Sequence, residues 1–278
     1  MTGRIVVGWT DSAEAHAALD WAVHQALLTG RSVTLAHEMT RGATGTEDPG
    51  NAWEVEAKAR RRVEAIRRTV VGEFPDLEFQ PVVEWGEPGA GLLRWSRSAD
   101  ILAVGAPPNR HLRMLGALTD HLAAAAESPV ALVPRTWRGN SRGARTVAVG
   151  ATSSPGGRAA LKFASHEAIR MTASLVAVIG ADRHSEQARA ILQNLEHVEN
   201  ECPGLPIEIH WEKGDVAPAL IRISQTSQIV VLGTHHSPDR WSIRLGPVTD
   251  LVLGHTACPV ITVARLRARS DTELVGSG

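Results

Sequence analysis

The sequence contains no tyrosine, only three phenylalanines and only two cysteines in 278 residues. Cys202 and Cys258 are too few for a disulfide framework in a chain of this length, which is typical of a reducing cytosol. The formal net charge is −1, so the composition gives no electrostatic footprint for nucleic acid or an anionic membrane. No stretch approaches 18 uninterrupted apolar residues, and the N-terminus shows no signal-peptide pattern. We therefore predict a cytoplasmic protein with no nucleic-acid partner and no membrane partner.

The eight tryptophans do not replace the missing tyrosines as a stacking platform for bases. They are scattered along the chain and do not follow one strand face. Packing in the core and at interfaces explains them better. Trp21 and Phe163 stand at matching helix positions of the two halves, which favours the core interpretation.

What the sequence does contain is an internal repeat that spans almost the whole chain. Residues 4–22 match residues 146–164 at an offset of 142, and Gly8 then falls on Gly150. Four further segments match at offsets of 128 to 130: 86–94 with 214–222, 99–105 with 227–233, 115–122 with 245–252, and 128–133 with 258–263. The repeat predicts two halves with the same fold.

The boundary between the halves is expected in "RTWRGNSRGA" (135–144), which has the composition of a linker. We accordingly predict a first domain at 1–138, a second domain at 139–268 and a flexible tail at 269–278. The first half is also longer, because the offset falls from 142 to 128. The loop at 39–51, rich in Gly, Thr and acidic residues, is the expected place of the insertion, and we hypothesise that it covers a ligand crevice.

Each half alternates strand and helix patterns, and several strands are nearly continuous apolar runs. Such runs are typical of strands buried on both faces of a parallel sheet. Ser12 and Ser154 are expected to cap the first helix of each half, and Pro155 suits the first helical position. The expected strands are 4–8, 32–37, 78–84, 100–105, 129–134, 145–150, 174–179, 206–211, 227–233 and 259–264. The expected helices of the first half are 13–29, 52–72, 89–98 and 116–126. This pattern predicts an open doubly wound sheet in each half, with any ligand at the carboxyl ends of the strands.

These motifs resemble the universal stress protein family in its tandem two-domain form. The opening "IVVG…DS…AALDWA", the "GEP…LL" turn, "ADILAVG" and the closing "SPVALVP" and "ACPVITVA" follow the family pattern, over about 4–134 and 145–265. The resemblance implies an α/β fold of two tandem Rossmann-like (adenine nucleotide alpha hydrolase-like) domains, each an open five-stranded parallel sheet flanked by helices, with strand order 3-2-1-4-5. It also implies that the last strands, 129–134 and 259–264, meet across the halves as an intramolecular pseudo-dimer. A homodimer of two chains remains open.

The resemblance also points to a nucleotide site. Members of the family that bind ATP look like G-x2-G-x9-G-[S/T] after the fourth strand, with an acidic residue just after the first-strand glycine. Carried over to this sequence, the candidate or remnant site residues are Gly8, Thr10, Asp11, Gly105, Gly116 and Thr119 in the first half, and Gly150, Thr152, Gly233, Gly246 and Thr249 in the second.

Both halves depart from this ATP pattern. In the second half Gly233 and Gly246 keep the family spacing, but His236 replaces the middle glycine. Pro247 replaces the hydroxyl residue and removes a backbone N–H at the start of a helix. In the first half the glycines are two residues too close, two prolines follow the first of them, Ala117 replaces the Ser or Thr, and both halves carry threonine at the acidic position. We therefore expect no tightly bound cofactor, with ATP as the alternative.

Other kinds of chemistry have weaker signals. The pair His235–His236 has no Cys or acidic residue at ligand spacing nearby, so we predict no metal site. No G-x-S-x-G elbow follows a strand, and no histidine pair follows the first strand, so we predict no catalytic residues. Cys258 is expected to pack as a small apolar residue and Cys202 to be more accessible.

Three functions remain after these exclusions. The leading interpretation is a non-catalytic protein of stress or dormancy physiology that acts through partners or weak small-molecule binding. The alternative is a stress sensor that binds ATP or AMP in one half. An enzyme of unknown reaction on the same scaffold is the third. The sequence identifies neither the stress signal nor the partner protein.

Overall fold

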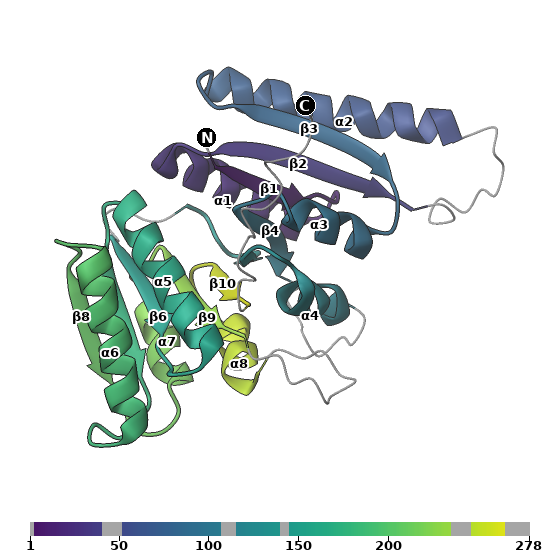
Figure 1. The fold of residues 1–278 in the computed structure, drawn as a ribbon. Coiled ribbons are helices and arrows are strands. Elements are labelled where there is room, and N and C mark those ends of the chain that lie inside the picture. The colour runs from purple at the N-terminus through teal and green to yellow at the C-terminus, as the bar shows by residue number, and fades with distance from the viewer. Residues whose placement is uncertain (1–2, 41–51, 107–114, 140–144, 235–245, 265–278) are drawn as a thin grey trace, which may run out of the picture.

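The protein forms one ten-stranded sheet that is covered by helices on both faces (Figure 1). This computed structural model describes residues 3–40, 52–106, 115–139, 145–234 and 246–264. The strands lie in the order β3-β2-β1-β4-β5-β10-β9-β6-β7-β8. Counted within each half, this is the order 3-2-1-4-5 twice, so the predicted α/β fold and strand order are confirmed.

The described elements follow the predicted pattern of alternation. The first half contains β1 (Arg4–Gly8), α1 (Ala13–Thr29), β2 (Ser32–Met39), α2 (Ala52–Glu73), β3 (Phe79–Trp85), α3 (Pro88–Ser96), β4 (Ile101–Ala106), α4 (Leu115–Ala125) and β5 (Val130–Pro134). The second half contains β6 (Thr146–Gly150), α5 (Pro155–Arg170), β7 (Ser174–Ile179), α6 (Glu186–Glu201), β8 (Ile207–Trp211), α7 (Ala217–Ser224), β9 (Ile229–Gly233), α8 (Pro247–His255) and β10 (Val260–Val263).

The predicted ends of the strands and of the first-half helices all agree with the structure within two residues. The strand predicted at 32–37 was too short, because β2 continues to Met39. Its last residues still pair with β3, where Glu38 lies opposite Glu84 and Met39 opposite Trp85. This extension places Glu38 in strand β2, paired with β3, rather than in the loop that follows.

The first helix of each half begins at the predicted serine cap. The Ser12 hydroxyl accepts a hydrogen bond from the Ala15 N–H at 3.1 Å, and the Ser154 hydroxyl accepts one from the Gly157 N–H at 3.0 Å. Each bond satisfies a backbone donor that has no partner within its helix. Pro155 occupies the first position of α5, as predicted.

The two halves join through their last strands. β10 pairs with β5 antiparallel, with Ile261 opposite Ala131, whereas the neighbouring strands within each half pair parallel. The carboxyl ends of the first-half strands therefore point to the opposite edge of the sheet from those of the second half. Each half consequently has its own crevice, and the two crevices lie at opposite edges of one continuous sheet.

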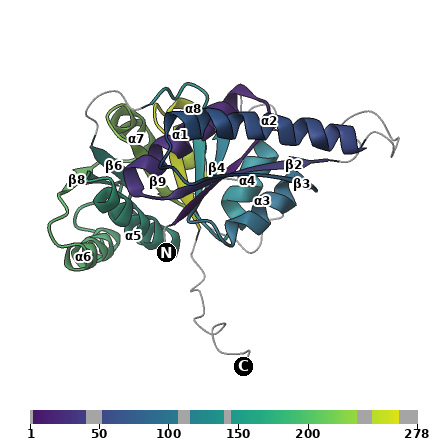
Figure 2. The same cartoon turned by 90° about the horizontal axis from the view of Figure 1, so that it is seen from above.

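Two layers of helices enclose the sheet, as the view in Figure 2 shows. Side chains of α1, α2, α5 and α6 share one buried cluster on one face, and side chains of α3, α4, α7 and α8 share the cluster on the other. Trp21 is fully buried in the first cluster, and Phe163 packs against it at the matching position of the second half. Trp137, in the predicted linker, is buried as well and lies 5.9 Å from the His24 ring, so the linker begins as part of the core.

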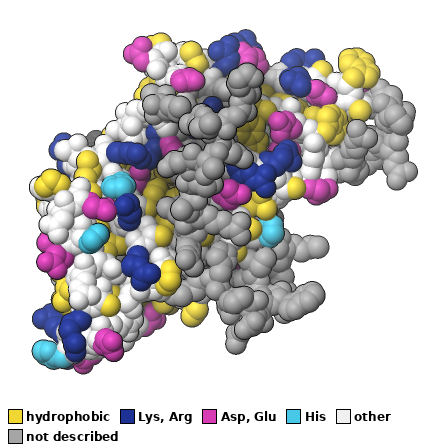
Figure 3. Space-filling view, in the orientation of Figure 1, with side chains coloured by type: hydrophobic (Ala, Val, Ile, Leu, Met, Phe, Trp, Pro, Cys, Tyr) yellow, Lys and Arg dark blue, Asp and Glu magenta, His cyan; other side chains and the backbone are white. Residues whose placement is uncertain are grey.

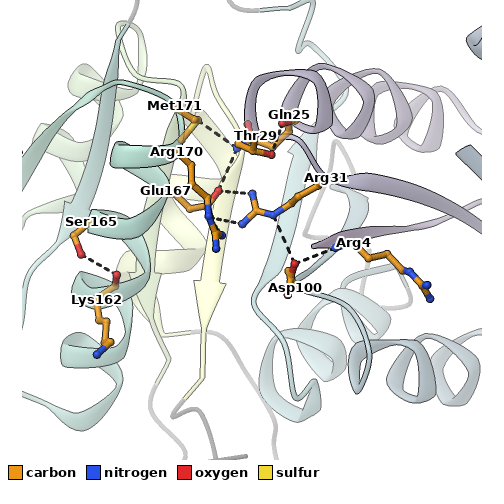
Figure 4. A network of polar contacts seen from close by, with 10 residues as sticks. All are labelled: Arg4, Gln25, Thr29, Arg31, Asp100, Lys162, Ser165, Glu167, Arg170 and Met171. Atoms are coloured by element: carbon orange, nitrogen blue, oxygen red, sulfur yellow. Dashed lines mark hydrogen bonds and ion pairs between the residues drawn. The ribbon is translucent and has the colours of Figure 1, made fainter. Parts of the chain in front are cut away.

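A buried polar network connects the halves on the α1/α5 face (Figure 4). The Arg31 guanidinium donates to both carboxylate oxygens of Glu167, with an Nη1–Oε2 distance of 2.8 Å. The side chains of Arg31 and Glu167 are 2% and 0% exposed. Gln25 donates to the same carboxylate at 3.3 Å, and Arg170 donates to it at 3.0 Å. A bidentate, buried ion pair of this kind fixes the orientation of the two halves.

Candidate functional site

In the described part of the chain, each half has a cavity where the carboxyl ends of its central strands meet the helices that follow. A further cavity of about 630 Å³ lies beside it in the second half, at the ends of β7 and β8, and is lined by charged and polar residues such as Asp182, His184 and Glu212. The first-half cavity has a volume of about 460 Å³ and is bounded by the ends of β1, β2 and β4 and by α1, α3 and α4. The second-half cavity has a volume of about 450 Å³ and is bounded by the corresponding parts of β6, β9, α7 and α8. Both volumes fall in the range of small-molecule sites, and the position is the one expected for a doubly wound sheet.

The second-half cavity brings together all five candidate residues of that half. These residues are Gly150, Thr152, Gly233, Gly246 and Thr249. Ala123 and Ala124, near the end of α4 in the first half, also line this cavity. The second-half crevice is therefore completed by a helix from the other half, which the sequence did not predict.

The first-half cavity brings together four of its six candidates, Gly8, Thr10, Gly105 and Thr119. Asp11 does not line it. Its carboxylate instead forms an ion pair with Arg62 of α2 at 2.9 Å, and both side chains are more than half exposed. Gly116 lies in the first turn of α4.

The threonines at the family's acidic position bind the helix caps. The Thr10 hydroxyl donates to the Ser12 hydroxyl at 3.1 Å, and the hydroxyls of Thr152 and Ser154 are 2.8 Å apart. These bonds hold the cap serines that start α1 and α5. A local structural role thus accounts for the two threonines without a ligand.

Gly105 and Gly233 permit a close approach between the end of a strand and the start of a helix. A Cβ added at Gly105 would lie 2.5 Å from backbone atoms of Glu14 in α1. A Cβ added at Gly233 would lie 2.7 Å from the Gly157 nitrogen and would also overlap Gly156. The glycine at this motif position is therefore required by the packing of each half, whether or not phosphate binds.

The start of α8 is the place where a phosphate would meet the second half. Gly246 is the N-cap, Pro247 occupies the first helical position, and no side chain caps this helix. The Thr249 side chain is buried at the cavity wall. Proline at the first position leaves the N–H groups of the next two residues but not its own. The departures at His236 and at the prolines after Gly105, and the pair His235–His236, lie outside the described residues.

Few ionisable groups border the cavities in the part of the chain that the structure describes. Asp215 is the one such residue in the second-half cavity that contains Thr249, and its carboxylate already accepts a hydrogen bond from the Ala217 N–H at 2.9 Å. The first half has Glu14, which lies 3.9 Å from Arg135, and Glu38. Within the described ranges no group of three or more His, Cys, Asp or Glu residues is arranged to hold a metal ion.

Within this site, Glu38 is the ionisable group whose surroundings shift its pKa. Its side chain is 3% exposed, and neither carboxylate oxygen has a hydrogen-bond partner among the described residues. Burial raises the pKa of this carboxyl, while the Arg94 guanidinium, 3.6 Å away, and His37 lower it, and Glu84 raises it further. A buried carboxylate without a hydrogen-bond partner lowers stability, and such a group in a native structure calls for an explanation.

We predict that Glu38→Gln stabilises the protein at neutral pH. Because the folded-state pKa is raised, the folded state binds a proton more tightly than the unfolded state, and stability is lost as pH rises through the folded pKa. The gain for the variant should be absent below pH ~4 and reach about 1 kcal/mol at pH 7, the order of an unsatisfied buried group. Urea unfolding of both proteins from pH 4 to 8 measures it. An equal difference at every pH would contradict this assignment.

The cysteine prediction needs one correction. Cys202 was expected to be accessible, but it is 3% exposed because it closes the C-terminus of α6 and turns into the core. Cys258 is buried as predicted, and burial raises the pKa of its thiol to about 12. A thiol in this state does not form the reactive thiolate at neutral pH.

Charges of both signs are interspersed over the face drawn in Figure 3. On that face neither half presents a large patch of one sign outside the residues drawn in grey. Among the described residues, no helix is long and apolar enough to cross a membrane. The mixed surface charges agree with the near-zero net charge of the sequence.

The fold and the two crevices define a class of protein: a tandem Rossmann-like α/β protein with a ligand-sized cavity at the carboxyl edge of each half. Residues 1–134 match the model of the Universal stress protein family. A universal stress protein of Mycolicibacterium smegmatis is 27% identical over 93% of this chain and 96% of its own length. One from Mycobacterium tuberculosis is 25% identical over 94% and 95%.

Solved structures agree on the fold. A universal stress protein from Archaeoglobus fulgidus superposes with a TM-score of 0.75 at 16% identity, covering 94% of this chain and 96% of that one. A putative universal stress protein from Pseudomonas aeruginosa gives a TM-score of 0.54 at 12% identity, covering 95% and 93%. The first half thus matches the universal stress protein family, and relatives that cover most of the chain support a UspA-like, tandem-domain protein.

Proposed function

We propose that this chain is a non-catalytic tandem universal stress protein of stress or dormancy physiology, with a phosphate loop degraded in each half. The observation that carries the proposal is the chemistry of the second-half cavity. Asp215 is its one ionisable wall residue within the described part of the chain, and that carboxylate is already engaged at the start of α7. Such a wall can bind a small molecule, but it offers no acid and base pair for proton transfer.

The phosphate end of the site supports the same proposal. Pro247 removes one donor from the helix start, and the threonine at the acidic position is bonded to a cap serine. The glycine that best matches the family motif, Gly233, already has a packing role. The remaining likeness to an ATP site therefore lies in the shape of the crevice more than in its phosphate contacts.

Steady-state turnover tests the non-catalytic part of the proposal. The purified full chain should release phosphate from millimolar Mg-ATP at the rate of the buffer alone. A rate that rises in proportion to protein concentration and falls in Thr249→Val would refute the proposal. The equivalent first-half variant, Thr119→Val, is the matched control for this substitution.

A second candidate function is a sensor that binds ATP or AMP in the second half. The second-half cavity favours it, because most of its wall residues are glycine, alanine, valine or threonine and Gly246 keeps the family spacing. Calorimetric titration with AMP tests this candidate. Binding that is lost in Thr249→Val but kept in Thr119→Val would support the sensor, and no heat at millimolar AMP would remove it.

The partner proposal rests on the junction between the halves. We propose that the halves act as an intramolecular pseudo-dimer, which the β5–β10 pairing and the Arg31–Glu167 ion pair support. A homodimer of two chains, the cytoplasmic location, and the division at 1–138, 139–268 and 269–278 stay predictions. The lid hypothesis for the 39–51 loop also stays a prediction, because residues 41–51 lie outside the described part.

A further inference from the structure

The two crevices of this chain differ at one wall position. Glu38 at the end of β2 corresponds to Gly180 after β7, because β2 and β7 take the same register against β1 and β6. Both residues line the cavity of their own half. One crevice therefore has a carboxylate where the other has no side chain.

The helix residue that faces Glu38 is the smaller one in the first half, whereas the strand residue is the larger one there. Gly91 in α3 corresponds to Ala219 in α7. A Cβ added at Gly91 would overlap the Glu38 carboxylate and lie 2.7 Å from its Oε2. The first half thus combines a large side chain on the strand with glycine on the helix, and the second half combines glycine with alanine. The exchange shows that the first half is shaped to hold a carboxylate at this wall.

The Glu38 carboxylate is short of donors in that place. Neither oxygen has a hydrogen-bond partner within the described ranges, and Arg94 Nη2 lies 3.6 Å from Oε1. Arg94 is itself half-exposed and donates to Glu84 at 3.1 Å. A buried carboxylate normally accepts several hydrogen bonds. The described residues supply none to Glu38, so its two oxygens are open to donors from a ligand or from the rest of the chain.

We propose that the first-half cavity binds a guanine nucleoside and that Glu38 selects it. In the proposed complex the Glu38 side chain rotates away from Gly91 into the adjoining cavity, and its two oxygens accept hydrogen bonds from the N1–H and N2–H groups of the base. These two donors are parallel and adjacent, which is the pattern that a carboxylate binds bidentately. Adenine presents a ring nitrogen acceptor at the corresponding place and leaves the carboxylate unpaired.

The remaining walls suit a flat, weakly polar ring. Trp9, Leu92 and Val104 line the cavity, and its volume of about 460 Å³ accommodates a nucleoside. The proposal needs no phosphate contact, so it does not depend on the state of the glycine loops. It goes beyond the proposed function, because it assigns a ligand to the first half whether or not the second half binds AMP.

Calorimetric titration of the full chain with guanosine, inosine and adenosine tests the proposal. Guanosine should bind at least about tenfold more tightly than adenosine, because each hydrogen bond to a charged group is worth at least a factor of ten. Inosine, which keeps N1–H but lacks the amino group, should fall between them. In Glu38→Gln the preference should disappear, whereas Glu84→Gln, which removes a carboxylate near the same arginine but outside the cavity, should keep it.

A second variant distinguishes the space beside Gly91, where the Glu38 carboxylate lies in this structure, from the cavity where it would bind the base. Gly91→Ala fills that space and keeps the carboxylate, so the guanosine preference should survive. The proposal would be overturned if guanosine did not bind, or if wild type and Glu38→Gln preferred it equally. Neither outcome would affect the test of phosphate release from Mg-ATP, which concerns the second half. Glu38-dependent binding of N-methylguanidine without binding of guanosine would assign the donor pair to a guanidinium ligand and would also overturn the proposal.

Discussion

Replacing Arg31 by alanine is expected to lower the free energy of unfolding by about 3 kcal/mol. The substitution leaves the Glu167 carboxylate fully buried without its bidentate partner, and loss of one member of a buried pair typically costs about 3–5 kcal/mol. The lower end applies here because Gln25 and Arg170 still donate to the carboxylate. Urea unfolding of the full chain, followed by circular dichroism, measures the change.

The appropriate comparison is an exposed ion pair on α5, the helix that carries Glu167. Lys162 of α5 contacts Glu201 at 3.0 Å, with both side chains well exposed, so Lys162→Ala should change stability little. Glu167→Gln in the Arg31→Ala background should recover part of the loss, because the unpaired charge is then gone. If Arg31→Ala cost no more than Lys162→Ala, the network would not hold the halves together.

Gly233→Ala is expected to destabilise the protein by about 3 kcal/mol or more. The new methyl group would meet rigid backbone atoms of Gly156 and Gly157 at the start of α5, and no flexible side chain can move to make room. Overpacking of this kind typically costs about 1–3 kcal/mol, and backbone contacts lie at the upper end. Thermal and urea unfolding measure the loss without reference to any ligand.

Gly254→Ala is the matched control for this change. Gly254 lies in α8, and nothing lies within 4 Å of a Cβ added there. Alanine is the better helix former, so this variant should be neutral or slightly more stable. A Gly233→Ala protein as stable as Gly254→Ala would show that the motif glycine is kept for phosphate and not for packing.

The fold was predictable because its signals are local and occur twice. The apolar strand runs, the cap serines and the repeat offset each depend on a few neighbouring residues, and the register of β1 with β2 recurs in β6 with β7. The end of β2 was missed because polar residues such as Glu38 and Glu84 at an edge of the sheet weaken the apolar signal, although the backbone pairing continues.

The site was predictable only in part. Five second-half candidates meet in one cavity, whereas Asp11 of the first half turns away to Arg62. The Arg31–Glu167 pair was not predicted, because it depends on how two halves pack and has no fixed spacing in the sequence. A signal for it exists, since Gln25 and Glu167 occupy matching positions of the repeat and differ in charge.

The same comparison of matching positions would have found the asymmetry of the crevices. Glu38 and Gly180 stand at one repeat position and differ in size and charge. Differences between repeats therefore locate the interface and the specificity of each site, while the similarities between repeats define the fold.

Thermal unfolding of the full chain with and without millimolar Mg-ATP tests the central claim, that neither half retains a working triphosphate site. A ligand present at 1,000 times its dissociation constant adds about 4 kcal/mol to stability, which raises Tm by several degrees in a chain of this size. The account predicts a change in Tm of less than about 1 °C, well below that several-degree response. A rise of several degrees that Thr249→Val abolishes and Thr119→Val does not would contradict it.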